Sequence, residues 1–373
     1  MSASTSFDSI CSVGFDEMSL QVQPFERTCR YHKRQNQKFD CGQLLPKGMC
    51  PHLYRAAYPH ALALLYDATY PSSKGGKPVR KKIVKCPSGG ASVQVEVSIE
   101  YTMPLIMRKL KQMAVKTCLT FGIPAEYPDR NIKIKVLGIE GSCPLEHKVD
   151  EIYLFNIKNR EELCPASFYG SYPMFFDRQE GGNPASIHCP DPFGVLYSAP
   201  GITGSPGAFQ NFNIKVSNSN KVKADNCSPI GSHPIEKLLP KNLCPLVFYQ
   251  IYPYFVTFVH GGRFEWLQKG ESVKVHCPEP NGVMMGIESI RYESPGDGAI
   301  RVTVMEGGGD CGRGLKAGDV FEFDSRNQDF CFEALATLIP FKNVGGSIAC
   351  PSIESSLEFR TESTFKKAET SSA

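Results

Sequence analysis

The alternation of hydrophobic and polar positions between residues 130 and 199 predicts two strands, a helix and two further strands. Apolar and polar residues alternate in IKIKVLGI from Ile132, and EIYLFNI from Glu151 is a second strand-like run. We expect the aromatic segment LCPASFYGSYPMFF from Leu163 to be the helix. A Gly-Gly pair and the short strand-like runs SIHCP and GVLYSA follow it. This order is typical of a small α+β unit, β-β-α-β-β.

The same order of features recurs along the chain. Each copy has a leading cysteine, a cysteine at the expected helix start, a Gly-Gly pair, and a strand-like run closed by a third cysteine before a proline. Because a unit with a single helix has a thin core, neighbouring units are expected to stabilise one another. We therefore predict an α+β fold of four tandem β-β-α-β-β repeats packed against one another. In chain order, the three cysteines of each repeat are Cys29, Cys50 and Cys86; Cys143, Cys164 and Cys189; Cys227, Cys244 and Cys277; and Cys311, Cys331 and Cys350.

This frame divides the chain into repeats, linkers and two ends that we expect to be disordered. The predicted segments are a leader (1–24), repeat 1 (25–101), a linker helix (102–129), repeat 2 (130–199), a linker (200–210), repeat 3 (211–293), a linker (294–299), repeat 4 (300–362) and a tail (363–373).

The predicted linker helix is amphipathic. Its apolar residues recur at helical spacing while basic residues occupy the other positions. The favoured interpretation is a helix lying across the interface between repeats 1 and 2, and the alternative is a basic helix that binds a partner. The apolar residues are Leu105, Ile106, Leu110, Met113 and Ala114, and the basic residues are Arg108, Lys109, Lys111 and Lys116.

The overall charge gives no reason to expect nucleic-acid or membrane binding, since the 373 residues carry a net charge of only +3. The sequence has no run of apolar residues long enough for a transmembrane helix and no signal peptide at its start, so we expect a soluble, cytoplasmic protein. Thiols stay reduced in the cytoplasm. The 15 cysteines are therefore interpreted as metal ligands, reactive thiols or small buried hydrophobic residues before they are interpreted as disulfides.

Repeats 2 and 3 carry a combination of motifs that resembles a known but uncharacterised family of small, mostly bacterial single-domain proteins. Repeat 2 has CPLEHK, LCPASFYGSYP, Gly-Gly and HCPDP, and repeat 3 has LCPLVFYQIYP, HGGRFEW and HCPEP. The family pattern runs CP-x-GHK, LCP-x-x-F, YP, Gly-Gly with an aromatic residue and tryptophan, and ACPDP. Repeat 1 departs from this pattern, and repeat 4 lacks the histidine and the tryptophan. The resemblance implies the domain architecture and supplies no activity.

The cysteine before each helix is a candidate nucleophile. Proline favours the first helical position, so Cys-Pro at a helix start places the cysteine at the N-cap. There the helix dipole and the unpaired backbone N–H groups stabilise a thiolate. We predict Cys164 and Cys244 as catalytic thiols, and the alternative is that each is a buried cysteine in the core.

A histidine follows the leading cysteine in repeats 2 and 3, which suggests a metal site with three cysteine ligands and one histidine. Such a site would hold a transition metal, zinc or iron. The variable Cys-to-His spacing and the lack of any C-x-x-C motif argue against a rigid zinc knuckle, and the wide cysteine separations argue against an iron–sulfur cluster. The predicted ligand sets are Cys143, His147, Cys164 and Cys189 in repeat 2, and Cys227, His233, Cys244 and Cys277 in repeat 3.

Two classes of function are compatible with these residues. The first is a Cys/His metal- or thiol-dependent enzyme, a lyase, isomerase or oxidoreductase, acting on a small organic molecule in repeat 2 or 3. The second is a non-enzymatic cysteine-rich repeat protein that serves as a binding or scaffold module. The aromatic helices are most simply core, although they could also wall a pocket for a small apolar or aromatic molecule that Trp266 closes.

Overall fold

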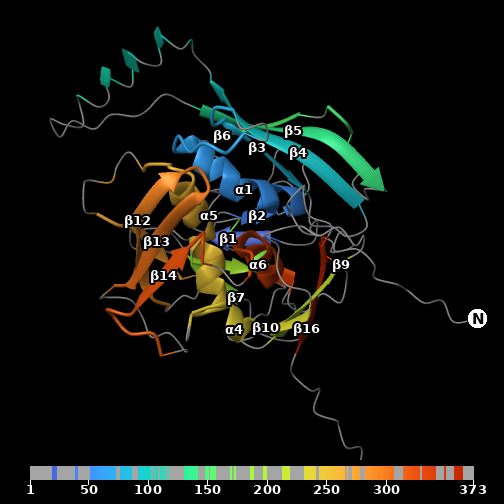
Figure 1. Ribbon diagram of the computed structural model, residues 1–373, viewed down its shortest axis with the longest axis vertical. Helices are drawn as coiled ribbons and strands as arrows, with labels where there is room; N and C mark the ends of the chain where they lie inside the picture. The colour runs from blue at the N-terminus through green and yellow to red at the C-terminus, as the bar shows by residue number, and fades with distance from the viewer. Residues whose placement is uncertain are drawn as a thin grey trace, which may run out of the picture.

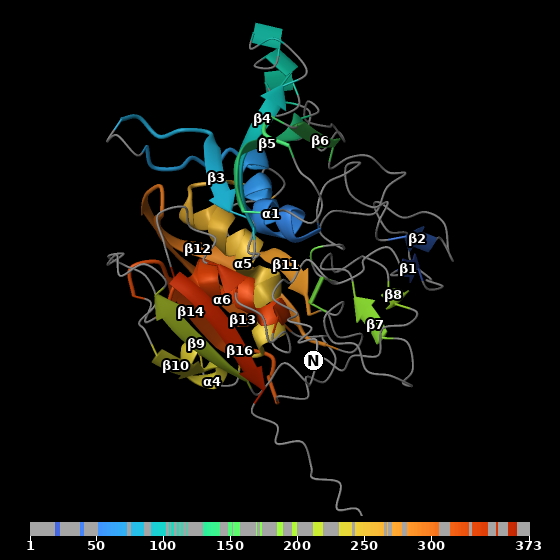
Figure 2. The same cartoon turned by 90° about the vertical axis from the view of Figure 1, so that its right-hand side faces the viewer.

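The structure is a computed structural model of the 373-residue chain, and it describes only part of the chain (Figures 1 and 2). The described residues are 19–22, 38–40, 51–72, 76–85, 91–101, 104, 106–107, 110–111, 113–114, 117, 130–141, 148–150, 152–156, 169, 172–173, 185–188, 196–199, 212–218, 231–240, 243–264, 267, 271–277, 282–305, 314–327, 330–341, 348–349 and 357–363.

The described strands form four antiparallel sheets of four strands each, which confirms mixed α+β content. Two sheets belong to the first half of the chain: β2 (Lys38–Asp40), β1 (Ser19–Val22), β8 (Leu196–Ala199) and β7 (Ala185–His188); and β3 (Lys81–Lys85), β4 (Ala91–Tyr101), β5 (Arg130–Gly141) and β6 (Ile152–Asn156). Two belong to the second half: β10 (Gly231–Pro234), β9 (Phe212–Asn218), β16 (Leu357–Ser363) and β15 (Ile348–Ala349); and β11 (Val273–His276), β12 (Met284–Ser294), β13 (Asp297–Val304) and β14 (Val320–Asp324).

Each sheet contains strands from two neighbouring predicted repeats, and β1 lies in the segment predicted as a disordered leader. β4 pairs with β5 from Ala91↔Gly141 to Tyr101↔Arg130, so the segment predicted to link repeats 1 and 2 connects two strands of one sheet. β12 and β13 are likewise neighbours, joined by the turn at Pro295 and Gly296. A turn this short can only connect antiparallel neighbours. A predicted β-β-α-β-β repeat would keep its strands together, whereas these sheets combine strands from two predicted repeats.

The helices begin where the cysteines predict. α1 (Pro51–Leu65), α5 (Pro245–Val259) and α6 (Phe332–Leu338) each start directly after one of the helix-starting cysteines. Cys244 is the N-cap of α5 with Pro245 in the first turn, as the Cys-Pro sequence predicts. The start of the corresponding helix in repeat 2, near Cys164, lies outside the described residues. Two shorter helical elements are α4 (Ile235–Leu238) and the 3₁₀ turn η5 (Ile339–Phe341).

The hydrophobic core lies around α1, α5 and α6. α5 is buried on almost every side, with Phe248, Tyr249 and Tyr252 all at most 5% exposed, so its aromatic residues are core as expected. Figures 1 and 2 show the two longer helices side by side in the middle of the molecule, with the β3–β6 sheet beside α1 and the β11–β14 sheet beside α5.

The Gly-Gly pair after α5 ends the helix. Gly261 has φ +75, and its N–H donates to Phe258 O at 3.0 Å, while the N–H of Gly262 donates to Thr257 O at 2.8 Å. These two bonds define a Schellman motif, in which a residue with positive φ satisfies the last carbonyl groups of the helix. The recurring Gly-Gly signal therefore has a structural cause at this position.

We expect Gly261→Ala to destabilise the protein more than Gly314→Ala. Both glycines have positive φ, which costs an L-residue about 1–2 kcal/mol. A Cβ at position 261 would also lie 2.6 Å from the ring of Tyr292, whereas nothing described lies within 4 Å of a Cβ at position 314. The difference between the two variants in urea unfolding measures the steric part. Equal free energies of unfolding would contradict the tight contact between Tyr292 and the helix end.

Candidate active site

A cluster of titratable side chains lies where three helices meet. His60 is in the last turns of α1, Glu333 is in the first turn of α6, and His260 is the C-cap residue of α5. Tyr70 follows α1 and is held in place by a bridge to Val79, with backbone bonds of 2.8 and 2.9 Å. The helix ends and this bridge bring together residues that are far apart in the sequence.

Three of these side chains form a continuous chain of polar contacts. The Tyr70 hydroxyl lies 3.0 Å from His60 Nδ1, and His60 Nε2 lies 3.4 Å from Glu333 Oε1. A carboxylate can only accept, so Nε2 carries the proton and donates to it. Nδ1 is then the acceptor for the hydroxyl proton of Tyr70. This arrangement of protons fits both contacts of the imidazole.

The surroundings set the charge of each group. Burial lowers the pKa of His60, and burial raises the pKa of Tyr70 well above its usual value, with a further contribution from the Glu333 charge. Burial alone would raise the pKa of Glu333, but the hydrogen bond from His60 and the charge of Lys82 outweigh it and lower that pKa to about 2. At neutral pH the cluster thus holds a carboxylate, a neutral imidazole and a protonated phenol.

A second imidazole adjoins the chain. The His260 ring centroid lies 4.2 Å from that of Tyr70, and its buried Nδ1 has no hydrogen-bond partner among the described residues. Burial, followed by the charges of His60 and Lys82, lowers the pKa of His260 to about 3, so this ring is neutral as well. Lys82 Nζ lies 5.7 Å from the Tyr70 ring centroid. A ligand here would meet one unused imidazole nitrogen and one cation.

The turn between β12 and β13 supports His260. The N–H of Gly296 donates to Val259 O at 3.1 Å, and a Cβ at Gly296 would lie 3.6 Å from Cε1 of His260. The backbone N–H of Thr69 also donates to His260 O at 3.0 Å. The backbone at the end of α5, which carries His260, is therefore held on both sides.

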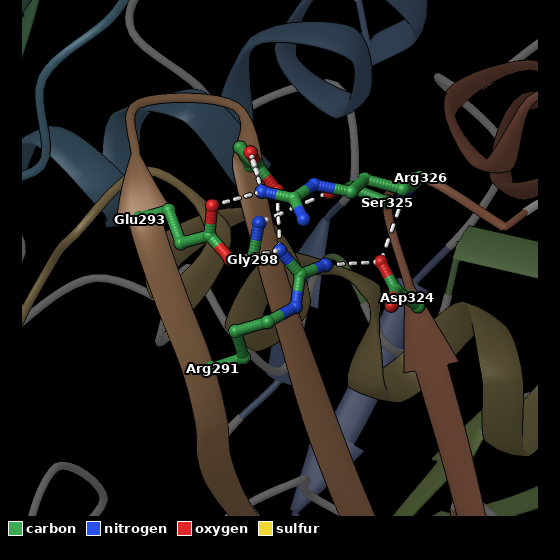
Figure 3. Close-up of polar contacts among 7 residues, drawn as sticks. Arg291, Glu293, Gly298, Asp324, Ser325 and Arg326 are labelled. Carbon is green, nitrogen blue, oxygen red and sulfur yellow. Dashed lines mark hydrogen bonds and ion pairs between the residues drawn. The ribbon is translucent and has the colours of Figure 1, made fainter.

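Ion pairs hold this turn on the sheet (Figure 3). Arg291 on β12 binds Asp297 Oδ1 at 2.6 Å and also contacts Asp324 at the end of β14, while Arg326 binds both Glu293 and Asp297. Such exposed pairs contribute little stability one by one, but a network of several charges restricts geometry. We infer that its role is to fix the turn beside His260.

A second buried cluster lies at the centre of the molecule. Tyr169 and Tyr249 stack with ring centroids 4.4 Å apart and an interplanar angle of 2°. Arg55 Nη2 donates to Ala336 O at 2.7 Å, and the guanidinium lies 5.8 Å from the ring centroids of Tyr249 and Tyr172. All of these side chains are buried, so the cluster joins the helices rather than facing solvent.

The structure places the described predicted site residues in the core or against it. Cys244 and Cys277 are 6% and 1% exposed and belong to the hydrophobic core, and neither is in a disulfide. Cys244 occupies the N-cap position but makes no side-chain capping hydrogen bond. The ring of His233 on β10 packs against Phe330, with centroids 5.6 Å apart. The remaining predicted residues, Cys143, His147, Cys164, Cys189 and Cys227, lie outside the described residues.

Within the described part of the chain, no group of three or more His, Cys, Asp or Glu side chains is placed to hold a metal ion. His233, Cys244 and Cys277 therefore do not form such a group by themselves. Both predicted ligand sets include residues outside the described ranges, and the zinc or iron site stays a prediction.

Sequence reasoning missed the cluster of His60, Tyr70, His260 and Glu333. A local signal existed for two of them, since His60 follows the proline inside α1 and His260 directly precedes the Gly-Gly pair. Nothing local connects either residue to Glu333, because that contact depends on how α1 packs against α6.

Comparison with protein-family models, with curated proteins and with solved structures finds no match for this chain. No described helix has the length and apolar character needed to cross a membrane.

Proposed function

We propose that the protein is an enzyme that removes a proton from a small organic molecule at the His60–Tyr70–Glu333 cluster. The observation that carries this proposal is the chain of contacts Tyr70–His60–Glu333, with a neutral imidazole between a phenol and a carboxylate. A base held in one tautomer by a carboxylate is the arrangement by which enzymes activate an otherwise weak proton acceptor.

The proposed step moves two protons in the same direction. The substrate gives a proton to the Tyr70 oxygen while Tyr70 gives its own proton to His60 Nδ1. Tyr70 thus stays a neutral phenol, in accord with its raised pKa. The imidazolium that forms lies beside the Glu333 carboxylate, which stabilises it. His260 Nδ1 would bind the substrate, and Lys82 would stabilise the negative charge that develops on it. Isomerases and lyases use this kind of proton abstraction.

Hydrogen exchange tests this step without knowledge of the complete reaction. The protein would be incubated in D₂O with a panel of small keto acids, ketones and aromatic carbonyl compounds, and loss of the α-hydrogen signal would be followed by NMR. We expect exchange above background for at least one compound, reduced about 10²–10⁴-fold in Tyr70→Phe and Glu333→Gln. Tyr292→Phe, on the exposed part of β12, is the matched control and should keep the wild-type rate. Exchange by Tyr70→Phe at the wild-type rate, or no exchange with any compound by the intact protein, would count against the proposal.

The thiol- or metal-dependent enzyme remains our second proposal, with the site in predicted repeat 2 or 3. The N-cap placement of Cys244 at the 15-residue helix α5 supports it, because the helix dipole there favours a thiolate. Cys244 is 6% exposed and Tyr70 of the first proposal is 2% exposed, so in both proposals a small molecule could reach the reacting atom only after a local opening. A transition metal would be zinc or iron, held by the predicted cysteine and histidine sets.

Metal analysis of anaerobically purified protein tests this second proposal. We expect close to one zinc or iron per chain, lost in Cys189→Ser or in Cys277→Ser according to which repeat holds the site. Cys118→Ser, outside the recurring cysteine frame, is the control and should keep the metal. Metal-free wild-type protein that is fully folded would leave the cysteines as core residues.

We also propose that the chain consists of four diverged copies of one unit. In the alternative to an enzyme, these copies form a binding or scaffold module. The residues five positions after the four helix-starting cysteines are Arg55, Tyr169, Tyr249 and Ala336. They meet at the centre of the molecule in two contacts, which supports the repeat interpretation. Tyr169 stacks on Tyr249, and Arg55 donates to Ala336 O. Equivalent positions of a fourfold repeat are expected to meet around a shared centre in this way. If the four copies share this centre, residues 1–205 and 206–373 should copurify when expressed as separate chains, because both central contacts join the two halves. Two halves that fold but never associate would contradict the shared centre.

A further inference from the structure

The helical segment between β4 and β5 exposes an apolar face. Ile106, Met107, Leu110 and Met113 are 74%, 58%, 61% and 67% exposed, more than any other large hydrophobic side chain in the described part of the chain. Figure 2 shows the segment at the top of the molecule, beyond the ends of β4 and β5 and away from α1 and α5. The expected packing of this helix across the interface between repeats 1 and 2 is therefore not observed for these residues.

Three of the exposed apolar residues share one side of the helix. Ile106, Leu110 and Met113 are three or four residues apart, which places them on one face. Short isolated helices are only marginally stable in water, and clustered exposed apolar side chains commonly mark an interaction site. The strand pair Tyr101↔Arg130 holds both ends of the connection together at the ends of the two central strands, β4 and β5. This face is thus presented at an extremity of the molecule.

The charge of the segment is concentrated and of one sign. Arg108, Lys109, Lys111 and Lys116 are the charged residues between positions 101 and 125, where the sequence has no Asp or Glu. Their four positive charges exceed the net charge of +3 of the whole chain. The small net charge of the whole chain, which predicted no membrane contact, therefore conceals a strongly basic stretch of sequence. Among the described residues of the segment, Lys111 is exposed.

We propose that this segment docks the protein peripherally on an anionic lipid surface. A short helix with an apolar face and basic residues lies in the membrane interface, where apolar insertion and attraction to anionic headgroups add together. A stable protein–protein interface usually takes about 20–30 residues a side, more than this projecting segment offers. A flat membrane can reach a helix at an extremity without contact with the sheets. The Leu110 and Met113 side chains enter the acyl boundary, and the lysines contact the headgroups.

Vesicle sedimentation of the full chain tests the proposal. The probes are vesicles of phosphatidylcholine alone and of phosphatidylcholine mixed with phosphatidylserine. We expect at least about tenfold tighter binding to the anionic vesicles, weakened by added salt. The double variant Leu110→Asp, Met113→Asp should lose binding, and Lys109→Glu, Lys111→Glu should weaken it at least about tenfold. Val320→Asp alters an apolar residue of β14 that is 50% exposed, and this control should bind as wild type.

The remaining outcomes overturn the proposal. Equal binding to both kinds of vesicle would show that the basic residues play no part. Failure to bind either kind, with self-association on gel filtration that the Leu110→Asp, Met113→Asp variant abolishes, would assign the face to a second copy of the chain. Failure to bind, with a monomeric wild type, would exclude a lipid surface as the occupant. Because Leu110, Lys111, Met113 and Val320 are exposed, all variants should keep the wild-type melting temperature, which separates loss of docking from loss of folding.

Discussion

Replacing Tyr249 by alanine is expected to lower the free energy of unfolding by about 3–5 kcal/mol, the usual cost of removing a large buried aromatic ring. Tyr249 is fully buried, stacks on Tyr169 with centroids 4.4 Å apart, and lies under the guanidinium of Arg55 at 5.8 Å. Tyr169 belongs to the first half of the chain, so the lost contacts are those that join the two halves. Urea unfolding at neutral pH would measure the change.

Tyr249→Phe is the matched control for this prediction. It keeps the ring and the stack and removes only a hydroxyl, so we expect a change within about 1 kcal/mol. An alanine variant as stable as wild type would show that the central stack does not hold the halves together. A phenylalanine variant as unstable as the alanine variant would assign the effect to the hydroxyl group and contradict the packing argument.

The elements that sequence predicted correctly are those that local chemistry determines. Cys244 followed by Pro245 predicts a helix start because proline is compatible with the first turn. The Gly-Gly pair at Gly261 ends α5 because its positive φ suits glycine. The aromatic residues of α5 are core because their number leaves no polar face.

The sheets could not be predicted in the same way because their pairing is not local. A strand with alternating apolar and polar residues, such as β5, offers the same backbone hydrogen bonds to any partner strand. Its sequence therefore does not predict that its neighbour is β4, from the preceding predicted repeat. The short turn at Pro295 and Gly296 contained the clue, since two strands so close in sequence form a hairpin. The recurring frame instead favoured a boundary at that turn.

The candidate active site was missed for a related reason. Recurring cysteines drew attention to Cys244 and Cys277, whose burial in the core is compatible with packing alone. His60 and Glu333 belong to different helices, and neither stands in a recognisable motif. Only the packing of α1 against α5 and of α5 against α6 reveals that their side chains meet.

Acidification is expected to destabilise the protein between pH 6.5 and 3, with His260 as a principal cause. The pKa of His260 is about 3 in the folded protein, against an ordinary value of 6.5, because the ring is buried beside His60 and Lys82. Between these values the unfolded chain binds a proton that the folded protein does not. The free energy of unfolding therefore falls as the pH falls, by up to about 1.4 kcal/mol per pH unit for one such histidine.

The lowered pKa of His60 acts in the same direction. Glu333, whose pKa of about 2 lies below its ordinary 4.5, adds to the loss below pH 4.5.

His260→Phe separates this contribution from the others. Phenylalanine fills the position beside Tyr70 without a titratable nitrogen, so urea unfolding from pH 7 to 4 should show a slope smaller by about one proton. Close to pH 8 the variant and the wild type should run nearly parallel, because His260 is then almost entirely neutral in both folded and unfolded chains. An unchanged slope below pH 6.5 would mean that His260 is protonated in the folded protein. In that case its Nδ1 would already carry a proton and could not accept a hydrogen bond from a substrate. A reduced slope means that the neutral ring beside Tyr70 keeps a nitrogen available to a ligand, as the proposed proton transfer requires.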